Sequence, residues 1–180
     1  MKVTGFVGSP RINGNTNTLV EKVLEGAKEK GAETKIYNLN AMNFKGCQAC
    51  YRCRKTSKCE VQDDMQILYK EILESDGIVI GSPIYMGQIT GQTKLFLDRF
   101  HSLVVPNSPL AGKKLIVIYS QEVPDKMAFQ PYFKIMKKMY DMAGFELLET
   151  VISIGSKDPK TIIEDADHLE HLKELGARMG

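Results

Sequence analysis

The sequence lacks long apolar runs, an excess of charge of either sign, internal repeats and low-complexity linkers. Its 24 basic and 22 acidic residues leave a net charge of +2 and are scattered, which argues against nucleic acid or a membrane surface as partner. An apolar run such as 115–119 is far shorter than the roughly 20 residues that span a bilayer. Because the chain enters a strand-like segment at once, with no secretory leader, we expect a cytoplasmic protein.

Cysteine is absent from all but one short segment. Cys47, Cys50, Cys53 and Cys59 are the only cysteines of the chain. A reducing cytosol disfavours a framework of structural disulfides. The concentration of thiols in one segment therefore indicates chemistry other than crosslinking.

Strand-like and helix-like segments alternate along the 180 residues. Strands are predicted at 3–8, 34–39, 77–81, 115–119 and 145–154, and helices at 19–27, 63–73, 95–103, about 131–143 and about 159–175. Met136, Met139 and Met142 are expected to pack against the sheet. The alternation predicts one α/β domain over 1–180, a doubly wound sheet of five parallel strands in the order 2-1-3-4-5 with helices on both faces.

The loop after the first strand has the composition of a phosphate site. In a doubly wound sheet, ligands bind outside the carboxyl ends of the strands, where the strand order reverses. There the start of a helix offers free N–H groups and its positive dipole end, and Gly14 permits a tight turn. The alternative is a polar loop with an ordinary Asn or Thr helix cap. The candidate phosphate ligands are Ser9, Arg11, Asn13, Asn15 and Thr16.

The loop after the third strand, residues 82–91, suits a planar heterocycle. Its proline and two glycines shape the backbone so that N–H groups can face a ring, and its Tyr and Met offer stacking surface. The alternative is a connecting loop whose Tyr only covers the core. The candidate ring contacts are Pro83, Ile84, Tyr85, Met86 and Gly87.

Together, the two loops resemble those of the NADPH-dependent FMN reductase group of flavodoxin-like proteins, and so does the helix with Gly91, Lys94, Asp98 and Arg99. The resemblance implies that FMN is bound, with its phosphate in the first loop and its isoalloxazine ring in the second. The loop after the fourth strand, which begins at Ser120, departs from the glycine common in relatives. Ser120 is kept as a candidate FMN contact.

The cysteine spacing, Cys-x2-Cys-x2-Cys-x5-Cys, lies in an insertion at about 45–60. Soft thiolates this close together suit an iron–sulfur cluster. The segment resembles that of the iron–sulfur flavoprotein family, which implies a [4Fe–4S] cluster held by Cys47, Cys50, Cys53 and Cys59. Zinc and metal-free thiols are the alternatives, although structural zinc sites usually use two separated pairs of cysteines.

These features predict an FMN-dependent oxidoreductase in which no side chain is an evident acid, base or nucleophile. Its cluster and FMN would pass electrons from a ferredoxin-like donor to a small-molecule acceptor such as a quinone, dioxygen or peroxide. The alternatives are an NAD(P)H-dependent FMN or quinone reductase without a cluster, and a thiol-based redox sensor or metal-binding module. A homodimer or homotetramer is expected, because transfer from cluster to flavin could cross a subunit interface.

Two pairs of charged residues have simpler interpretations. Asp63 and Asp64 are expected to cap the helix that follows them. Asp98 and Arg99 are expected to form either an intersubunit pair or a surface salt bridge.

Overall fold

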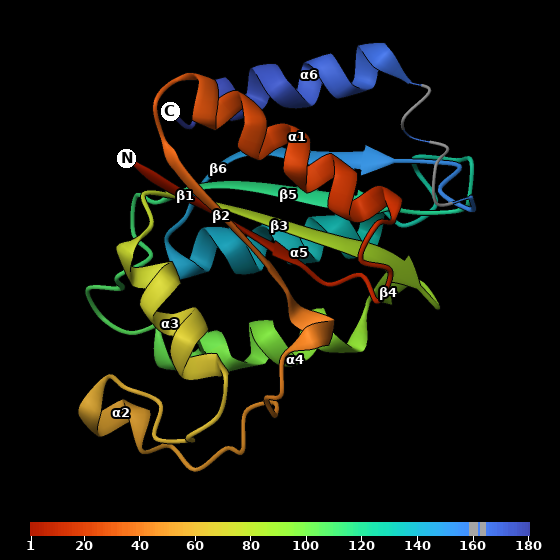
Figure 1. Cartoon of the computed structure of the whole chain (residues 1–180). Helices are drawn as coiled ribbons and strands as arrows, with labels where there is room; N and C mark the ends of the chain where they lie inside the picture. Colours follow the sequence, from red (N-terminus) through yellow and green to blue (C-terminus); the bar gives the residue numbers. More distant parts are fainter. Residues whose placement is uncertain (159–161, 163–164) are drawn as a thin grey trace.

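The centre of the molecule is a sheet of five parallel strands in the order β2-β1-β3-β5-β6 (Figure 1). The computed structural model describes residues 1–158, 162 and 165–180. The strands are β1 (Lys2–Val7), β2 (Glu33–Asn38), β3 (Gly77–Tyr85), β5 (Lys114–Ser120) and β6 (Glu146–Ser153). Numbered among themselves, the five parallel strands have the order 2-1-3-4-5, so the predicted doubly wound sheet is confirmed.

One further short strand was not predicted. β4 (Gln88–Ile89) pairs antiparallel with the end of β3, with Ile84 opposite Ile89. Met86 and Gly87 form the turn, and both have positive φ values, 51° and 81°, as a type I′ hairpin turn requires. Residues 82–91, predicted to be a loop throughout, are therefore largely a hairpin that extends β3.

The strand side chains alternate between two separate cores. Phe6, Ile80 and Val117 belong to the core on one face, whereas the adjacent Val7 and Ile118 belong to the core on the other. The three central strands are almost wholly buried, as expected when both faces of a parallel sheet are covered.

Helices cover each face (Figure 1). α1 (Asn15–Glu29) and α6 (Ala166–Ala177) lie on one side, and α3 (Met65–Glu74), α4 (Gly91–Asp98) and α5 (Gln130–Ala143) lie on the other. α1 and α6 touch through glycines, since a Cβ on Gly26 would come within 1.9 Å of the Lys173 carbonyl oxygen. The remaining helical segments are short: η1 (Leu39–Ala41), α2 (Cys53–Thr56) and η2 (Arg99–Ser102).

Two predictions need correction, one on the start of a helix and one on the packing of methionine side chains. The helix predicted from about 159 begins at Ala166, where the Asp165 side chain accepts the backbone N–H of His168; positions 159–161 and 163–164 lie outside the described residues. The expectation that Met139 and Met142 pack against the sheet is wrong, because they are 53% and 73% exposed on α5.

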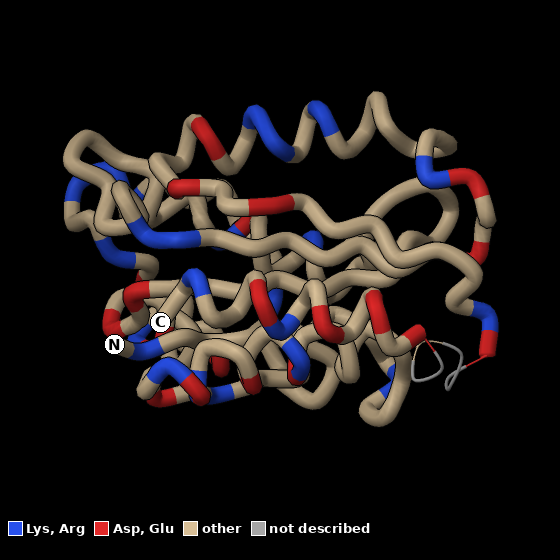
Figure 2. Tube along the Cα trace, turned by 90° about the horizontal axis from the view of Figure 1, so that it is seen from above, with Lys and Arg blue, Asp and Glu red and all other residues tan. Residues whose placement is uncertain are grey.

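Charged residues of both signs are interspersed along the helices and loops (Figure 2). Among the described residues, no helix has the length and apolar character required to cross a membrane.

Candidate functional site

A pocket of about 300 Å³ opens at the carboxyl ends of the central strands. Its lining comes from the loop after β1, the end of β3, the end of β5 with the loop that follows, and the loop after β6, as the switch-point rule for doubly wound sheets predicts. The lining residues are Ser9, Arg11, Gly14, Asn15, Thr16, Pro83, Ile84, Tyr85, Ser120, Glu122, Ser156 and Lys157. The structure thus brings together eight of the eleven residues predicted for flavin binding, and Asn13, Met86 and Gly87 are not among the lining residues.

The N-terminus of α1 forms one end of this pocket. Gly14 is its N-cap in extended conformation, and no side chain of the described residues caps the first turn. The first-turn N–H groups and the helix dipole therefore favour an anion here. Arg11 and Lys157 add positive charge, and the Arg11 guanidinium donates to the Lys157 carbonyl oxygen at 3.2 Å.

Asn15 and Thr16 also have polar partners already. The Asn15 amide donates to the Asp158 carbonyl oxygen at 2.7 Å, which anchors the loop after β6. Thr16 Oγ1 and Ser120 Oγ lie 2.7 Å apart and share a hydrogen bond. Because a hydroxyl can make more than one hydrogen bond, Thr16 and Ser120 can still contact a ligand in the pocket that they line.

The hairpin β3-β4 forms the opposite wall. Tyr85 is 48% exposed and Met86 is fully exposed at its tip. A buried hydroxyl group fixes the base of the hairpin: Thr90 Oγ1 donates to the Gly8 carbonyl oxygen at 2.7 Å and accepts the backbone N–H of Thr93 at the start of α4. Sequence reasoning missed this contact, although Thr90 stands where a helix cap is expected.

It also missed Ser156 and Lys157, which follow β6. The signal for them was available in principle, because β6 is parallel to the other strands and its end lies at the same edge of the sheet. Their place beside Arg11 depends on a contact between residues 146 positions apart, which sequence spacing alone does not show.

The four cysteines lie away from this pocket, in residues 45–60, here called the cysteine segment. All four line one depression of about 20 Å³, together with Arg99, His101 and Ser102 among others. Cys53 is buried, Cys59 is half-buried, and Cys47 and Cys50 are exposed. Within the described part of the chain, no group of three or more His, Cys, Asp or Glu residues could hold a metal ion as arranged.

The backbone of the cysteine segment is unusual. Ala49, Tyr51 and Ser57 have φ values of 51°, 55° and 55°, in the left-handed region. Tyr51 is followed by Arg52 in right-handed helical conformation. When a residue in left-handed conformation is followed by one in right-handed conformation, their backbone N–H groups point toward the same side. Such pairs form anion-binding concavities, including those of iron–sulfur sites.

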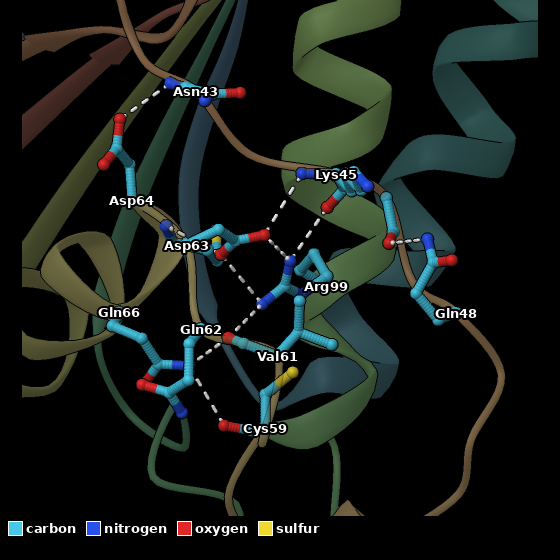
Figure 3. Close-up of polar contacts among 12 residues, drawn as sticks. Asn43, Lys45, Gln48, Cys59, Val61, Gln62, Asp63, Asp64, Gln66 and Arg99 are labelled. Carbon is cyan, nitrogen blue, oxygen red and sulfur yellow. Dashed lines mark hydrogen bonds and ion pairs between the residues drawn. The ribbon is translucent and has the colours of Figure 1, made fainter.

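Arg99 closes the base of the cysteine segment (Figure 3). Its guanidinium is 1% exposed and binds both carboxylate oxygens of Asp63, at 2.7 and 3.2 Å. The predicted intersubunit or surface pair of Asp98 with Arg99 is therefore wrong: Asp98 pairs with Lys94 on the surface of α4. Burial opposes ionisation of Asp63, but hydrogen bonds from Arg99 and from the backbone of Lys45 outweigh it, so the pKa of Asp63 falls below its ordinary value of 3.8.

The capping prediction for the two aspartates is correct only for Asp63. Asp63 accepts the backbone N–H of Met65 at the start of α3, at 3.1 Å. Asp64 instead accepts the backbone N–H of Asn43 at 2.7 Å.

Acid should weaken the fold through Asp63. A carboxyl whose pKa is lower folded than unfolded stabilises the fold fully above pH 3.8, and this contribution is lost as pH falls toward the folded pKa. Asp63→Asn should cost about 3 kcal/mol at neutral pH, because it leaves the buried Arg99 without a counter-charge. Urea unfolding of the metal-free protein at several pH values should show the difference between variant and wild type shrink below pH 3.8. If the difference in the free energy of unfolding between Asp63→Asn and wild type did not depend on pH, the Asp63 carboxylate would not be the source of this stability.

Comparisons with known proteins agree with the fold. A family model described as NADPH-dependent FMN reductase matches residues 1–128. An iron–sulfur flavoprotein of Methanocaldococcus jannaschii is 40% identical over 103 residues, covering 57% of this chain and 53% of the relative. The match spans about half the length of the iron–sulfur flavoproteins, 53% to 59% for three of them.

Solved structures share the architecture at low sequence identity. An NAD(P)H:quinone oxidoreductase from Methanothermobacter marburgensis is 16% identical with a TM-score of 0.77, covering 99% of this chain and 96% of the other. A flavodoxin from the domain Archaea is 18% identical with a TM-score of 0.63, covering 99% and 96%. The fold is therefore flavodoxin-like. Because the family model matches well over half of the chain, this protein belongs to the NADPH-dependent FMN reductase family.

Proposed function

We propose that the protein is an FMN-dependent oxidoreductase that binds FMN in the pocket at the ends of the central strands. The observation that carries the proposal is the convergence of the loop after β1, the end of β3 and the end of β5 on one pocket, whose end is the uncapped N-terminus of α1. A phosphate fits the positive end of this pocket, and a flat ring fits the side lined by the exposed Tyr85. FMN, when bound, supplies both one- and two-electron transfer.

The chain itself would bind and orient the flavin. Arg11 and the first turn of α1 would hold the phosphate, and the hairpin would cover one side of the ring. Glu122 is the one carboxylate that lines the pocket, and its oxygen lies 3.8 Å from the Lys157 ammonium on the surface. In this proposal the flavin carries the electrons, and the chain's own residues bind and orient it.

We further propose that Cys47, Cys50, Cys53 and Cys59 ligate a [4Fe–4S] cluster. The residues fit the group by chemistry: four thiols line one depression whose backbone contains left-handed residues that present N–H groups to an anion. The depression has room for about one water molecule, so ligation requires the exposed Cys47 and Cys50 to shift. The cluster, when bound, would supply single-electron transfer.

Two partners belong to this proposal, an acidic electron donor and further copies of the same chain. Arg52, Lys55 and Lys58 are exposed within the cysteine segment, and Arg52 pairs with Glu60 at 3.0 Å. The exposed positive charges would attract an acidic, ferredoxin-like donor, which a fall in the transfer rate with rising salt would test. Figure 1 shows α2 at the lower left, away from the arrowheads of the strands, so transfer from cysteines to flavin within one chain would be long. A homodimer or homotetramer, testable by light scattering, would shorten it.

The experiment that tests the proposal is purification without oxygen, followed by an absorption spectrum with iron and sulfide assays on the same sample. We expect about one FMN, about four iron and about four sulfide per chain. Protein without flavin after incubation with micromolar FMN would contradict the flavin site. It would favour a thiol-based sensor or metal-binding module instead.

A second function is an NAD(P)H-dependent FMN or quinone reductase whose cysteines bind no metal. It is supported by the arrangement of the cysteines, which in the described residues does not form a metal site. Flavin without iron, together with rapid bleaching of that flavin by NADPH in metal-free protein, would select this function.

A further inference from the structure

We propose that Arg99 is a positioning residue for the cysteine segment: it ties the two ends of the segment together and supplies an N–H donor to its sulfur atoms. The inference rests on the proposed cluster. It begins from a charge that is almost completely buried, because Arg99 is 1% exposed although charged residues seldom occupy such positions without a specific partner.

The guanidinium holds both ends of the segment. Nη1 donates to the carbonyl oxygen of Lys45 at 2.8 Å, and Nη2 donates to that of Val61 at 3.4 Å. Lys45 stands two positions before Cys47, and Val61 stands two positions after Cys59. One side chain therefore joins the points where the chain enters and leaves the segment (Figure 3).

Asp63 completes the closure. Besides binding the guanidinium through both carboxylate oxygens, it accepts the backbone N–H of Lys45 at 3.2 Å. The backbone of Lys45 is thus held at both of its polar groups: Arg99 donates to its carbonyl oxygen, and Asp63 accepts from its N–H. We call this arrangement of Arg99 and Asp63 the clasp.

Gln66 reinforces the exit side of the segment. Its side-chain amide donates to the carbonyl oxygens of Cys59, at 3.0 Å, and Val61, at 2.7 Å (Figure 3). Gln66 thus holds the backbone at Cys59, and Gln66 and Arg99 together hold it at Val61. Hydrogen bonds of this kind orient metal ligands and are known to tune metal affinity.

Within the part of the chain that the structure describes, one donor group of Arg99 lacks a hydrogen-bond partner. Among the described residues, its Nε atom is buried without a hydrogen-bond acceptor, and such groups are rare in folded proteins. Arg99 lines the same depression as the four cysteines. A sulfur ligand or a cluster sulfide in that depression would satisfy the Nε–H group, and hydrogen bonds to sulfur raise the reduction potential of iron–sulfur clusters.

The test compares three variants with a matched control. Arg99→Met removes the positive charge and all the N–H donors of the guanidinium. Arg99→Lys keeps the charge but loses the planar guanidinium with its Nε–H group. Asp63→Asn removes the negative charge that faces Arg99. Lys94→Gln is the control, since Lys94 forms an exposed pair with Asp98 one turn away on α4. FMN binding should stay at the wild-type level in all four, which shows that the fold survives.

The first readout needs no cluster. In metal-free protein, the alkylation rate of the buried Cys53 should rise about tenfold or more in Arg99→Met, because the ends of the segment are released. Lys94→Gln should react as the wild type does. Equal rates in Arg99→Met and wild type would overturn the clasp.

The second readout concerns the loaded protein. Iron affinity, measured by competition with a chelator, should fall about 10- to 100-fold in Arg99→Met and by less in Arg99→Lys. Arg99→Lys should still lower the midpoint potential of the cluster in an EPR-monitored titration, because it lacks the Nε donor. An unchanged potential in Arg99→Lys would overturn the donor role.

Failure of the proposed cluster would look different. Wild-type protein that binds FMN but takes up no iron under anaerobic reconstitution would overturn both the cluster and the Nε donor. The alkylation rates would then still decide the clasp.

Discussion

Replacing Cys53 with alanine is expected to abolish iron binding and to leave FMN bound. Cys53 is the only buried cysteine of the four described, and it begins α2, so its sulfur has a more fixed position than those of the exposed Cys47 and Cys50. Loss of one thiolate from a four-cysteine set removes a quarter of the ligands of a [4Fe–4S] cluster. Iron and sulfide should fall from about four per chain to near zero, measured by colorimetric assay after anaerobic reconstitution.

The control for this variant is Gln48→Ala. Gln48 lines the same depression, and its side chain donates to the carbonyl oxygen of Gly46 rather than to a cysteine. It should keep the full iron content. Full iron content in Cys53→Ala would show that Cys53 is no ligand, and loss of FMN from Cys53→Ala would show that the change damages the fold rather than the cluster.

The strand order could be predicted because it depends on local patterns. Each central strand is a short apolar run, and each run is separated from the next by an amphipathic helix, which leaves few topologies for a parallel sheet. The alternation of Val7 with Phe6, or of Val117 with Ile118, then distributes the side chains between the two cores. The position of the pocket followed from the same topology.

Other features depend on contacts that local patterns do not encode. The hairpin at Met86 and Gly87 lacks the Asn-Gly or Asp-Gly pair that usually marks a type I′ turn. Burial of Arg99 could not be foreseen either, because a charged residue is expected at the surface unless its partner is known. That partner, Asp63, lies 36 positions earlier and has the sequence context of an ordinary helix cap.

Placing a negative charge in the loop after β1 should exclude FMN. Ser9 is 3% exposed and lines the pocket, and its hydroxyl accepts the backbone N–H of Arg11 at 3.1 Å. Ser9→Asp puts a carboxylate beside the N-terminus of α1, where it would occupy the donors that a phosphate needs and would repel it. Two charges about 4 Å apart near a protein surface repel by about 4 kcal/mol, which corresponds to about a thousandfold in affinity.

Ser9→Asn separates the charge from the shape, since asparagine has nearly the same volume as aspartate and is neutral. In fluorescence titrations, Ser9→Asp should bind FMN at least about a hundredfold more weakly than Ser9→Asn. Riboflavin, which has the same ring and no phosphate, should bind the two variants equally. The comparison thus identifies the part of the flavin that faces Ser9. If Ser9→Asp weakened the binding of FMN and riboflavin equally, the ring would lie at this loop. If the two variants bound FMN with equal affinity, the phosphate would not lie at the N-terminus of α1.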